Sequence, residues 1–123
     1  MLGMEVTNER IENYLTDILS QEDPVLIGME SRACKLDFPI VGPLVGRLLH
    51  QLVLLTRASR ILELGSGFGY SGYWLGSALG EPDEIHLTEF SKENLELAKG
   101  YFSQGKIYCH TYFHQGDGVE ILE

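Results

Sequence analysis

The sequence is poor in positive charge and has no long apolar run. Nine Lys and Arg residues stand against eighteen Asp and Glu residues, so the formal net charge is −9 at pH 7. An acidic chain repels polyanions unless its few cations cluster, and we therefore expect neither nucleic acid nor a membrane surface as a partner. No window reaches the ~18 apolar residues of a membrane span, and no basic segment followed by an apolar one marks a secretion signal. We expect a cytoplasmic protein.

Cysteine is also scarce, which limits the disulfide bonds and metal sites that the chain can form. Cys34 and Cys109 are the two cysteines, they lie far apart, and neither belongs to a CxxC pair. This pattern is typical of a reducing compartment and favours neither a disulfide framework nor a thiolate metal site. His110 and His114 lie on one predicted strand, about 13 Å apart, which is too far to share one ion. We predict no metal site in this sequence.

A length of 123 residues allows one compact domain. In its first part, residues 1–58, apolar residues at helical spacing predict three helices over 7–21, 25–36 and 44–57. The third of these is so rich in leucine that we expect it to be largely buried.

From residue 59 onward, apolar runs and helical patterns alternate. Strands are predicted over 60–64, 84–90 and 110–114, with helices over 70–80 and 91–102 between them. This βαβαβ order implies right-handed crossovers and a parallel sheet with strand order 3-2-1. The predicted fold class is α/β, with N-terminal helices followed by this sheet.

The stretch RILELGSGFGYSGYWLG, residues 60–76, leads from a strand into a helix through closely spaced glycines. Glycine permits a sharp turn at that point and lets a ligand approach the backbone. One reading of the spacing is GxGxxG at Gly67, Gly69 and Gly72, with Glu89 further on for a ribose hydroxyl. That reading predicts a dinucleotide-binding oxidoreductase fragment.

A second reading fits the predicted strand better. The strand ends at Leu64, so the dinucleotide frame begins two residues late, whereas Glu63-x-Gly65-x-Gly67-x-Gly69 begins at the turn itself. With an acid at the end of the next strand, this frame resembles the S-adenosylmethionine site of Rossmann-like methyltransferases. We favour it and keep the dinucleotide reading as an alternative.

The segments before and after the turn resemble one particular group of methyltransferases. FPIVGPLVGRLLHQL before it, and IHLTEFSKENLELAKGYF and GDGVEIL after it, resemble the small O-methyltransferases of the caffeoyl-CoA and catechol type, including their bacterial members. The resemblance extends from about Pro24 onward, and its most specific element is Gly69-Tyr70-Ser71. It implies a Rossmann-like methyltransferase fold, S-adenosyl-L-methionine as cofactor, and methyl transfer to a small hydroxylated acceptor.

The resemblance also assigns roles to single residues. Ser71 would hold the cofactor carboxylate and Glu89 both ribose hydroxyls. Glu63 would favour the cofactor's positive groups, and Phe90 would cover the adenine. The predicted cofactor-binding residues are Val41, Glu63, Gly65, Ser66, Gly67, Gly69, Tyr70, Ser71, Glu89, Phe90, Gly116, Asp117 and Gly118.

Members of that family are longer, and their divalent-metal ligands and catalytic lysine lie in a second half. We therefore expect a truncated, single incomplete methyltransferase domain over residues 1–123, with a helical segment over 1–58 and the cofactor-binding half over 59–123. Such a chain carries the half of the site that binds the methyl donor, and we can name no catalytic residue in it. We therefore expect it to be inactive in isolation. The alternative is a catalytically inactive module that binds S-adenosylmethionine or S-adenosylhomocysteine, or that serves assembly.

A sheet that stops at its first strand has an unpaired edge. Ile61, Leu62 and Leu64 would then form an exposed apolar edge strand, which is a template for pairing with another chain. We expect a homodimer through this edge.

Overall fold

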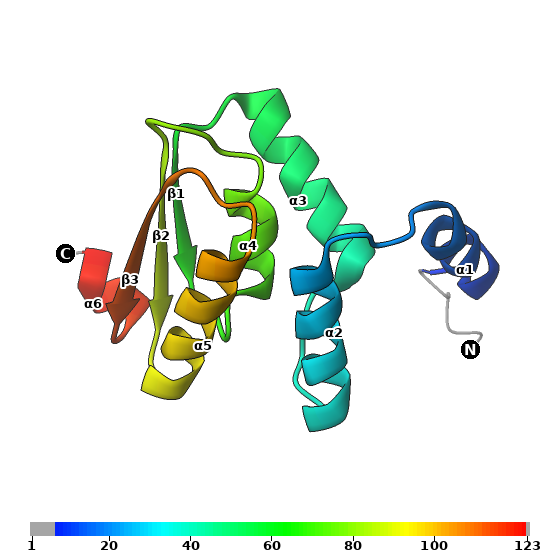
Figure 1. The fold of residues 1–123 in the computed structure, drawn as a ribbon, viewed down its shortest axis with the longest axis horizontal. Helices are drawn as coiled ribbons and strands as arrows, with labels where there is room; N and C mark the ends of the chain where they lie inside the picture. Colours follow the sequence, from blue (N-terminus) through cyan, green and yellow to red (C-terminus); the bar gives the residue numbers. More distant parts are fainter. Residues whose placement is uncertain (1–6, 123) are drawn as a thin grey trace, which may run out of the picture.

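The computed structural model describes residues 7–122 (Figure 1). Helices α1 (Glu9–Ile18), α2 (Pro24–Leu36) and α3 (Gly42–Thr56) come first. The second part alternates strands and helices, in the order β1 (Arg60–Leu64), α4 (Tyr70–Gly76), β2 (Glu84–Glu89), α5 (Lys92–Gln104), β3 (His110–Gln115) and α6 (Gly118–Leu122). Within the described residues, none of these helices combines the length and apolarity needed to cross a membrane.

The three strands form one parallel sheet in the order β1-β2-β3. This confirms the predicted βαβαβ unit with strand order 3-2-1. Helices α4 and α5 cover one face of the sheet, and the short α6 lies against the other (Figure 1). In the described part of the chain β1 has a strand neighbour on one side only, and Leu62 and Leu64 on it are 40% and 51% exposed.

Side-chain caps fix where three helices begin. Asn8 accepts a hydrogen bond from the backbone N–H of Arg10, and Asp23 accepts one from Val25 at 2.8 Å, directly before the proline that opens α2. Ser91 caps α5 through the N–H of Asn94. Such caps satisfy backbone donors that have no partner within the helix, which is why these residue types predicted the starts correctly.

The core lies between the sheet and helices α2, α4 and α5. Ile85 and Leu87 of β2 are fully buried there, together with Met29 of α2 and Tyr73 of α4. The buried Tyr73 hydroxyl donates to Asp23 Oδ2 at 2.8 Å, which connects α4 to the start of α2. Burial raises the pKa of Tyr73 to about 12, helped by this hydrogen bond to Asp23.

Helix α3 corrects one expectation from the sequence. We expected a largely buried helix, but only Gly46 and Val53 of α3 are buried, and Leu48 and Leu55 are 56% and 76% exposed. Helix α3 packs one side against α4, and its other side has few neighbours in the described residues. A strongly apolar helix can be buried, but how much of it is buried depends on which other segments pack against it.

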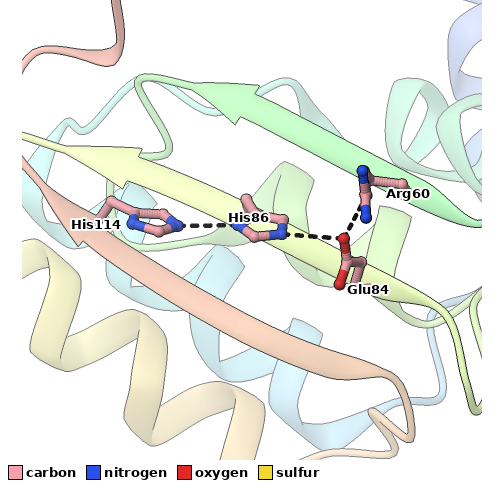
Figure 2. Close-up of polar contacts among 4 residues, drawn as sticks. All are labelled: Arg60, Glu84, His86 and His114. Carbon is pink, nitrogen blue, oxygen red and sulfur yellow. Dashed lines mark hydrogen bonds and ion pairs between the residues drawn. The ribbon is translucent and has the colours of Figure 1, made fainter. Parts of the chain in front are cut away.

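The face of the sheet opposite α4 and α5 carries a row of polar contacts (Figure 2). Arg60 pairs with Glu84, and the same carboxylate lies 3.4 Å from His86 Nε2. His86 Nδ1 lies 2.9 Å from His114 Nε2, so His114 is paired with His86 and not with His110. One of these two facing nitrogens must carry a hydrogen and the other must accept it, so this contact holds a single proton.

Candidate functional site

A cavity of about 370 Å³ opens at the carboxyl end of the sheet, which is where open α/β folds bind ligands. We call it the turn cavity, because the turn between β1 and α4 forms its floor. The loop between α2 and α3 and the end of β2 complete its wall. Its lining residues are Phe38, Pro39, Ile40, Val41, Gly65, Ser66, Gly67, Phe68, Tyr70, Ser71, Glu89 and Asn94.

The turn itself has the backbone conformation that its glycines predicted. Gly65, Gly67 and Gly69 all have positive φ, at 76°, 53° and 93°, a region that side chains with a Cβ rarely adopt. A Cβ on Gly67 would also come within 3.1 Å of the Phe38 ring. The turn is anchored to β2 because the N–H of Ser66 donates to the carbonyl of Thr88 at 2.8 Å.

Glu89 stands at the rim of the turn cavity with both carboxylate oxygens fixed. Its Oε2 accepts from the N–H of Gly67 at 2.7 Å, and its Oε1 accepts from the N–H of Ser91 at 2.9 Å. Each carboxylate oxygen has further lone pairs, so a ligand's hydroxyl groups can still donate to it. Because Glu89 is at the end of β2, the strand pairing sets its position beside the turn.

Ser71, in the first turn of α4, lines the same cavity and is backed by a buried acid. Its hydroxyl donates to Glu63 Oε1, whereas Glu63 Oε2 is buried and has no hydrogen-bond partner. Glu63 does not line the cavity itself. Burial raises the pKa of Glu63 to about 7, and the hydrogen bond from Ser71 offsets part of that rise. The carboxyl group therefore changes its charge near neutral pH, directly behind a residue of the cavity wall.

A second serine gives the turn cavity an unused polar group. Ser66 is only 6% exposed, and its Oγ is buried without a hydrogen-bond partner. A buried hydroxyl with no partner costs free energy. The Ser66 hydroxyl can therefore form a hydrogen bond with a ligand on the turn, whereas the Ser71 hydroxyl is already bonded to Glu63.

The structure brings seven of the predicted residues together around the turn cavity. They are Val41, Gly65, Ser66, Gly67, Tyr70, Ser71 and Glu89. Gly69 lies in the turn as the N-cap of α4, and Glu63 lies behind Ser71. Phe90 is 69% exposed and is not part of the lining.

The remaining predicted residues form the turn between β3 and α6, next to the cavity. The N–H of Gly116 donates to the carbonyl of Glu89 at 3.1 Å, which ties this turn to the end of β2. Asp117 accepts from the N–H of Val119 at 2.8 Å and so starts α6. Gly118 packs closely, because a Cβ there would come within 2.7 Å of the Leu64 side chain. None of the three lines the turn cavity.

Sequence reasoning missed five lining residues: Phe38, Pro39, Ile40, Phe68 and Asn94. The Phe-Pro pair was visible as a loop signal, but nothing in its spacing placed that loop over a turn almost thirty residues later. Asn94 follows the capping Ser91 by one helical turn, and this spacing indicates that it lies near the carboxyl end of the sheet, as Ser91 does. Among residues 7–122 the structure contains no group of three His, Cys, Asp or Glu side chains arranged to hold a metal ion.

Comparisons with known proteins agree with this geometry. A sequence profile described as O-methyltransferase matches residues 20–123. A catechol O-methyltransferase from Niastella koreensis is 27% identical over 116 residues, which cover 93% of this chain and 52% of that protein. The chain spans about half the length of the curated relatives it matches.

Solved structures show the same fold. A methyltransferase from Geobacter sulfurreducens superposes with a TM-score of 0.87 at 26% identity, over 94% of this chain and 60% of that one. The O-methyltransferase TomG from Streptomyces achromogenes, solved in complex with SAM, gives 0.80 at 28% identity, over 99% of this chain and 55% of that one. The strand order, the glycine turn and a family profile that matches most of the sequence lead to one conclusion: the chain belongs to the O-methyltransferase family.

Proposed function

We propose that this chain binds S-adenosyl-L-methionine in the turn cavity and supplies the donor side of an O-methyl transfer to a small hydroxylated acceptor. The observation that carries the proposal is the pairing of two oxygen groups in one cavity. Glu89, whose carboxylate accepts from the N–H of Gly67, and Ser71, in the first turn of α4, both line this cavity. S-adenosylmethionine-bound TomG, which shares this fold, supports the assignment.

The chemistry of the lining fits this cofactor. Glu89 would accept the ribose hydroxyls, while Ser71 and the unpartnered hydroxyl of Ser66 would face the methionine carboxylate. The bound cofactor supplies an electrophilic methyl group on a sulfonium. A cavity of about 370 Å³ lies within the usual range of small-molecule sites, roughly 300–1,000 Å³.

The same lining argues against a dinucleotide. Among residues 7–122, no Lys or Arg lines the turn cavity, and Glu89 is the one charged residue that does. A pyrophosphate brings negative charge only, whereas S-adenosylmethionine also carries a sulfonium and an ammonium, and a nearby carboxylate favours both of these positive groups. We therefore prefer the methyltransferase cofactor to NAD.

Calorimetric titration tests the proposal. We expect S-adenosylmethionine and S-adenosylhomocysteine to bind and NAD not to bind. Ser71→Ala and Glu89→Ala should each weaken the two adenosyl ligands by about tenfold or more, because hydrogen bonds to charged groups contribute ~1.5–3 kcal/mol.

Glu93→Ala, on the exposed first turn of α5, is the matched control and should bind as the unmodified chain does. Urea unfolding of each variant confirms that it is folded. Tighter binding of NAD than of the adenosyl ligands would contradict the assignment, and so would variants that bind them unchanged.

We also propose that two copies of the chain associate through the edge strand β1. Sedimentation equilibrium should show a dimer that dissociates on dilution, because Leu62 and Leu64 expose an unpaired apolar strand. Leu62→Lys should weaken the dimer by about tenfold or more, since a lysine on an edge strand opposes pairing. Leu36→Lys, at a leucine at the end of α2 that is 59% exposed, is the control. A monomer at every concentration would exclude this interface.

A further inference from the structure

Two histidines face each other on the side of the sheet opposite α4 and α5 (Figure 2). His86 of β2 pairs with Tyr112 of β3 in the strand register, and His114 follows Tyr112 by two residues, on the same face. The facing ring nitrogens, His86 Nδ1 and His114 Nε2, are 2.9 Å apart. Neither histidine lines the turn cavity, so the proposed binding of S-adenosylmethionine gives this pair no role.

A carboxylate orients the first of these rings. Glu84 Oε1 lies 3.4 Å from His86 Nε2, and the same carboxylate is paired with Arg60. A carboxylate beside one ring nitrogen favours the proton on that nitrogen, which leaves His86 Nδ1 with a lone pair toward His114. Proteins hold the imidazole ligands of metal ions in the same way, with a carboxylate on the nitrogen that does not bind the metal.

The histidine pair is held by its neighbours and is still open to solvent. The Tyr112 ring stacks on His86, with ring centroids 4.6 Å apart and planes 12° apart. The His86 and His114 rings themselves are nearly parallel, with 9° between their planes. The His86 side chain is 27% exposed. An ion from solution can therefore reach two rings that already have a common orientation.

The distance between the two nitrogens fits one metal ion. Imidazole nitrogens bind such ions at about 2.0–2.1 Å, so two of them at a right angle around one ion are about 2.9 Å apart. Each ring has to turn about its Cβ–Cγ bond to point its lone pair at the ion, and this torsion has a broad energy minimum. The ion takes the place of the single shared proton, which moves to Nδ1 of His114, so both rings stay neutral.

We propose that His86 Nδ1 and His114 Nε2 bind one divalent transition-metal ion, with Cu²⁺ preferred, and that this ion joins β2 to β3. Imidazole nitrogen suits Cu²⁺, Ni²⁺ and Zn²⁺, whereas Mg²⁺ and Ca²⁺ take oxygen ligands. Of the divalent first-row metals, Cu²⁺ binds a given nitrogen site most tightly, and it favours right angles between ligands. Because residues 7–122 contain no ligating group of three side chains, water completes the coordination.

Calorimetric titration of the untagged chain with copper(II) chloride tests the site. Cys34→Ser is the starting protein, because the exposed thiol of Cys34 also reacts with copper. We expect one Cu²⁺ per chain. His86→Gln and His114→Gln should each weaken its binding at least about tenfold, because each removes one of two protein ligands. His110→Gln, at an exposed histidine of the same strand as His114, is the matched control and should bind unchanged.

Electron paramagnetic resonance of the bound Cu²⁺ identifies the ligands. The spectrum should show coupling to two imidazole nitrogens, and to one in each of the variants His86→Gln and His114→Gln. Glu84→Ala should keep both nitrogen couplings and bind about tenfold more weakly, because loss of a carboxylate that orients a ligand usually costs about 10–100-fold in affinity. Zn²⁺ should bind more weakly than Cu²⁺, and Mg²⁺ should not compete with either ion.

Three results would overturn the proposal. The first is a chain that binds no Cu²⁺, and the second is binding that both His86→Gln and His114→Gln leave intact. The third is a spectrum of the starting protein without coupling to two imidazole nitrogens, a readout that does not depend on how well any histidine variant folds. Because neither histidine lines the turn cavity, each of these results leaves the proposed binding of S-adenosylmethionine unaffected.

Discussion

The affinity of the chain for S-adenosylhomocysteine is expected to rise about tenfold as the pH falls from 8 to 6. The cause is the Glu63 carboxyl behind Ser71, whose pKa burial raises to about 7. When Glu63 is ionised, the single hydroxyl proton of Ser71 is donated to it and is not free for a ligand. When Glu63 is protonated, it donates to Ser71 Oγ, and Ser71 can donate into the cavity toward a carboxylate.

The size of this effect follows from the protonated fraction of Glu63. With a pKa of about 7, that fraction falls about tenfold between pH 6 and pH 8. Glu63→Gln keeps a side-chain N–H donor at all pH values, so it should bind with the low-pH affinity throughout and lose the pH dependence. Ser71→Ala should also lose it, at a weaker affinity. Calorimetry at pH 6, 7 and 8 measures all three proteins.

Glu93→Gln is the control for a carboxylate that lies outside the turn cavity, and its pH profile should match that of the unmodified chain. An affinity that rises with pH would contradict the expectation. It would show that ionised Glu63 acts on the ligand's ammonium group, as the sequence resemblance implied, and not through the hydroxyl of Ser71.

The same carboxyl group affects the stability of the ligand-free chain. Its pKa is about 7 in the folded state against 4.5 for the ordinary group, so between these values the folded chain holds a proton that the unfolded chain has lost. Relative to its value at low pH, the free energy of unfolding therefore declines by up to ~3 kcal/mol as the pH rises from 4.5 through 7. In urea unfolding, Glu63→Gln should flatten this decline and be more stable than the unmodified chain at pH 8.

Gly46→Ala is expected to lower the free energy of unfolding by about 2 kcal/mol. Gly46 is the point where α3 packs against α4, and a Cβ there would lie 2.2 Å from Trp74 Nε1 and 2.3 Å from Trp74 Cδ1. The Trp74 side chain is 7% exposed. Either its indole ring or helix α3 must shift to make room for the added methyl group, and overpacking of this kind costs ~1–3 kcal/mol. Urea unfolding followed by far-ultraviolet circular dichroism measures the change.

Gly28→Ala is the matched control on the neighbouring helix. Gly28 is also inside a helix, α2, but a Cβ there would have no neighbour within 4 Å. The alanine should therefore raise the free energy of unfolding by about 0.5–1 kcal/mol, which is the usual gain in a helix interior. Equal effects of the two substitutions would show that contact with Trp74 does not limit the position of α3.

The parts of this structure that local rules determine were predictable from the sequence. The short apolar run of β1 and the capping residue Ser91 predicted the strand and the helix where they are found. The turn was predictable because glycine tolerates the positive φ that a sharp strand-to-helix turn needs, and three glycines have it. Glu89 followed from the same pattern, because parallel strands bring their carboxyl ends to one edge.

Other features depend on contacts between segments far apart in sequence. The exposure of Leu48 and Leu55 on α3 depends on which neighbours are present, and an apolar pattern alone does not state them. The position of Phe38 over Gly67 results from the packing of the loop before α3 against the turn. The pairing of His86 with His114 arises from strand register, which sets which residues of β2 and β3 are diagonal neighbours.

The two backbone hydrogen bonds to Glu89 have a consequence for the rate of binding. They join the glycine turn to the start of α5 in the ligand-free chain, through the N–H groups of Gly67 and Ser91. The carboxylate is thus already in place before a ligand arrives, and no loop has to become ordered around it. Binding of an adenosyl ligand then loses little conformational entropy at this end of the cavity. We expect association to be a single fast step there, without a slow phase from loop closure.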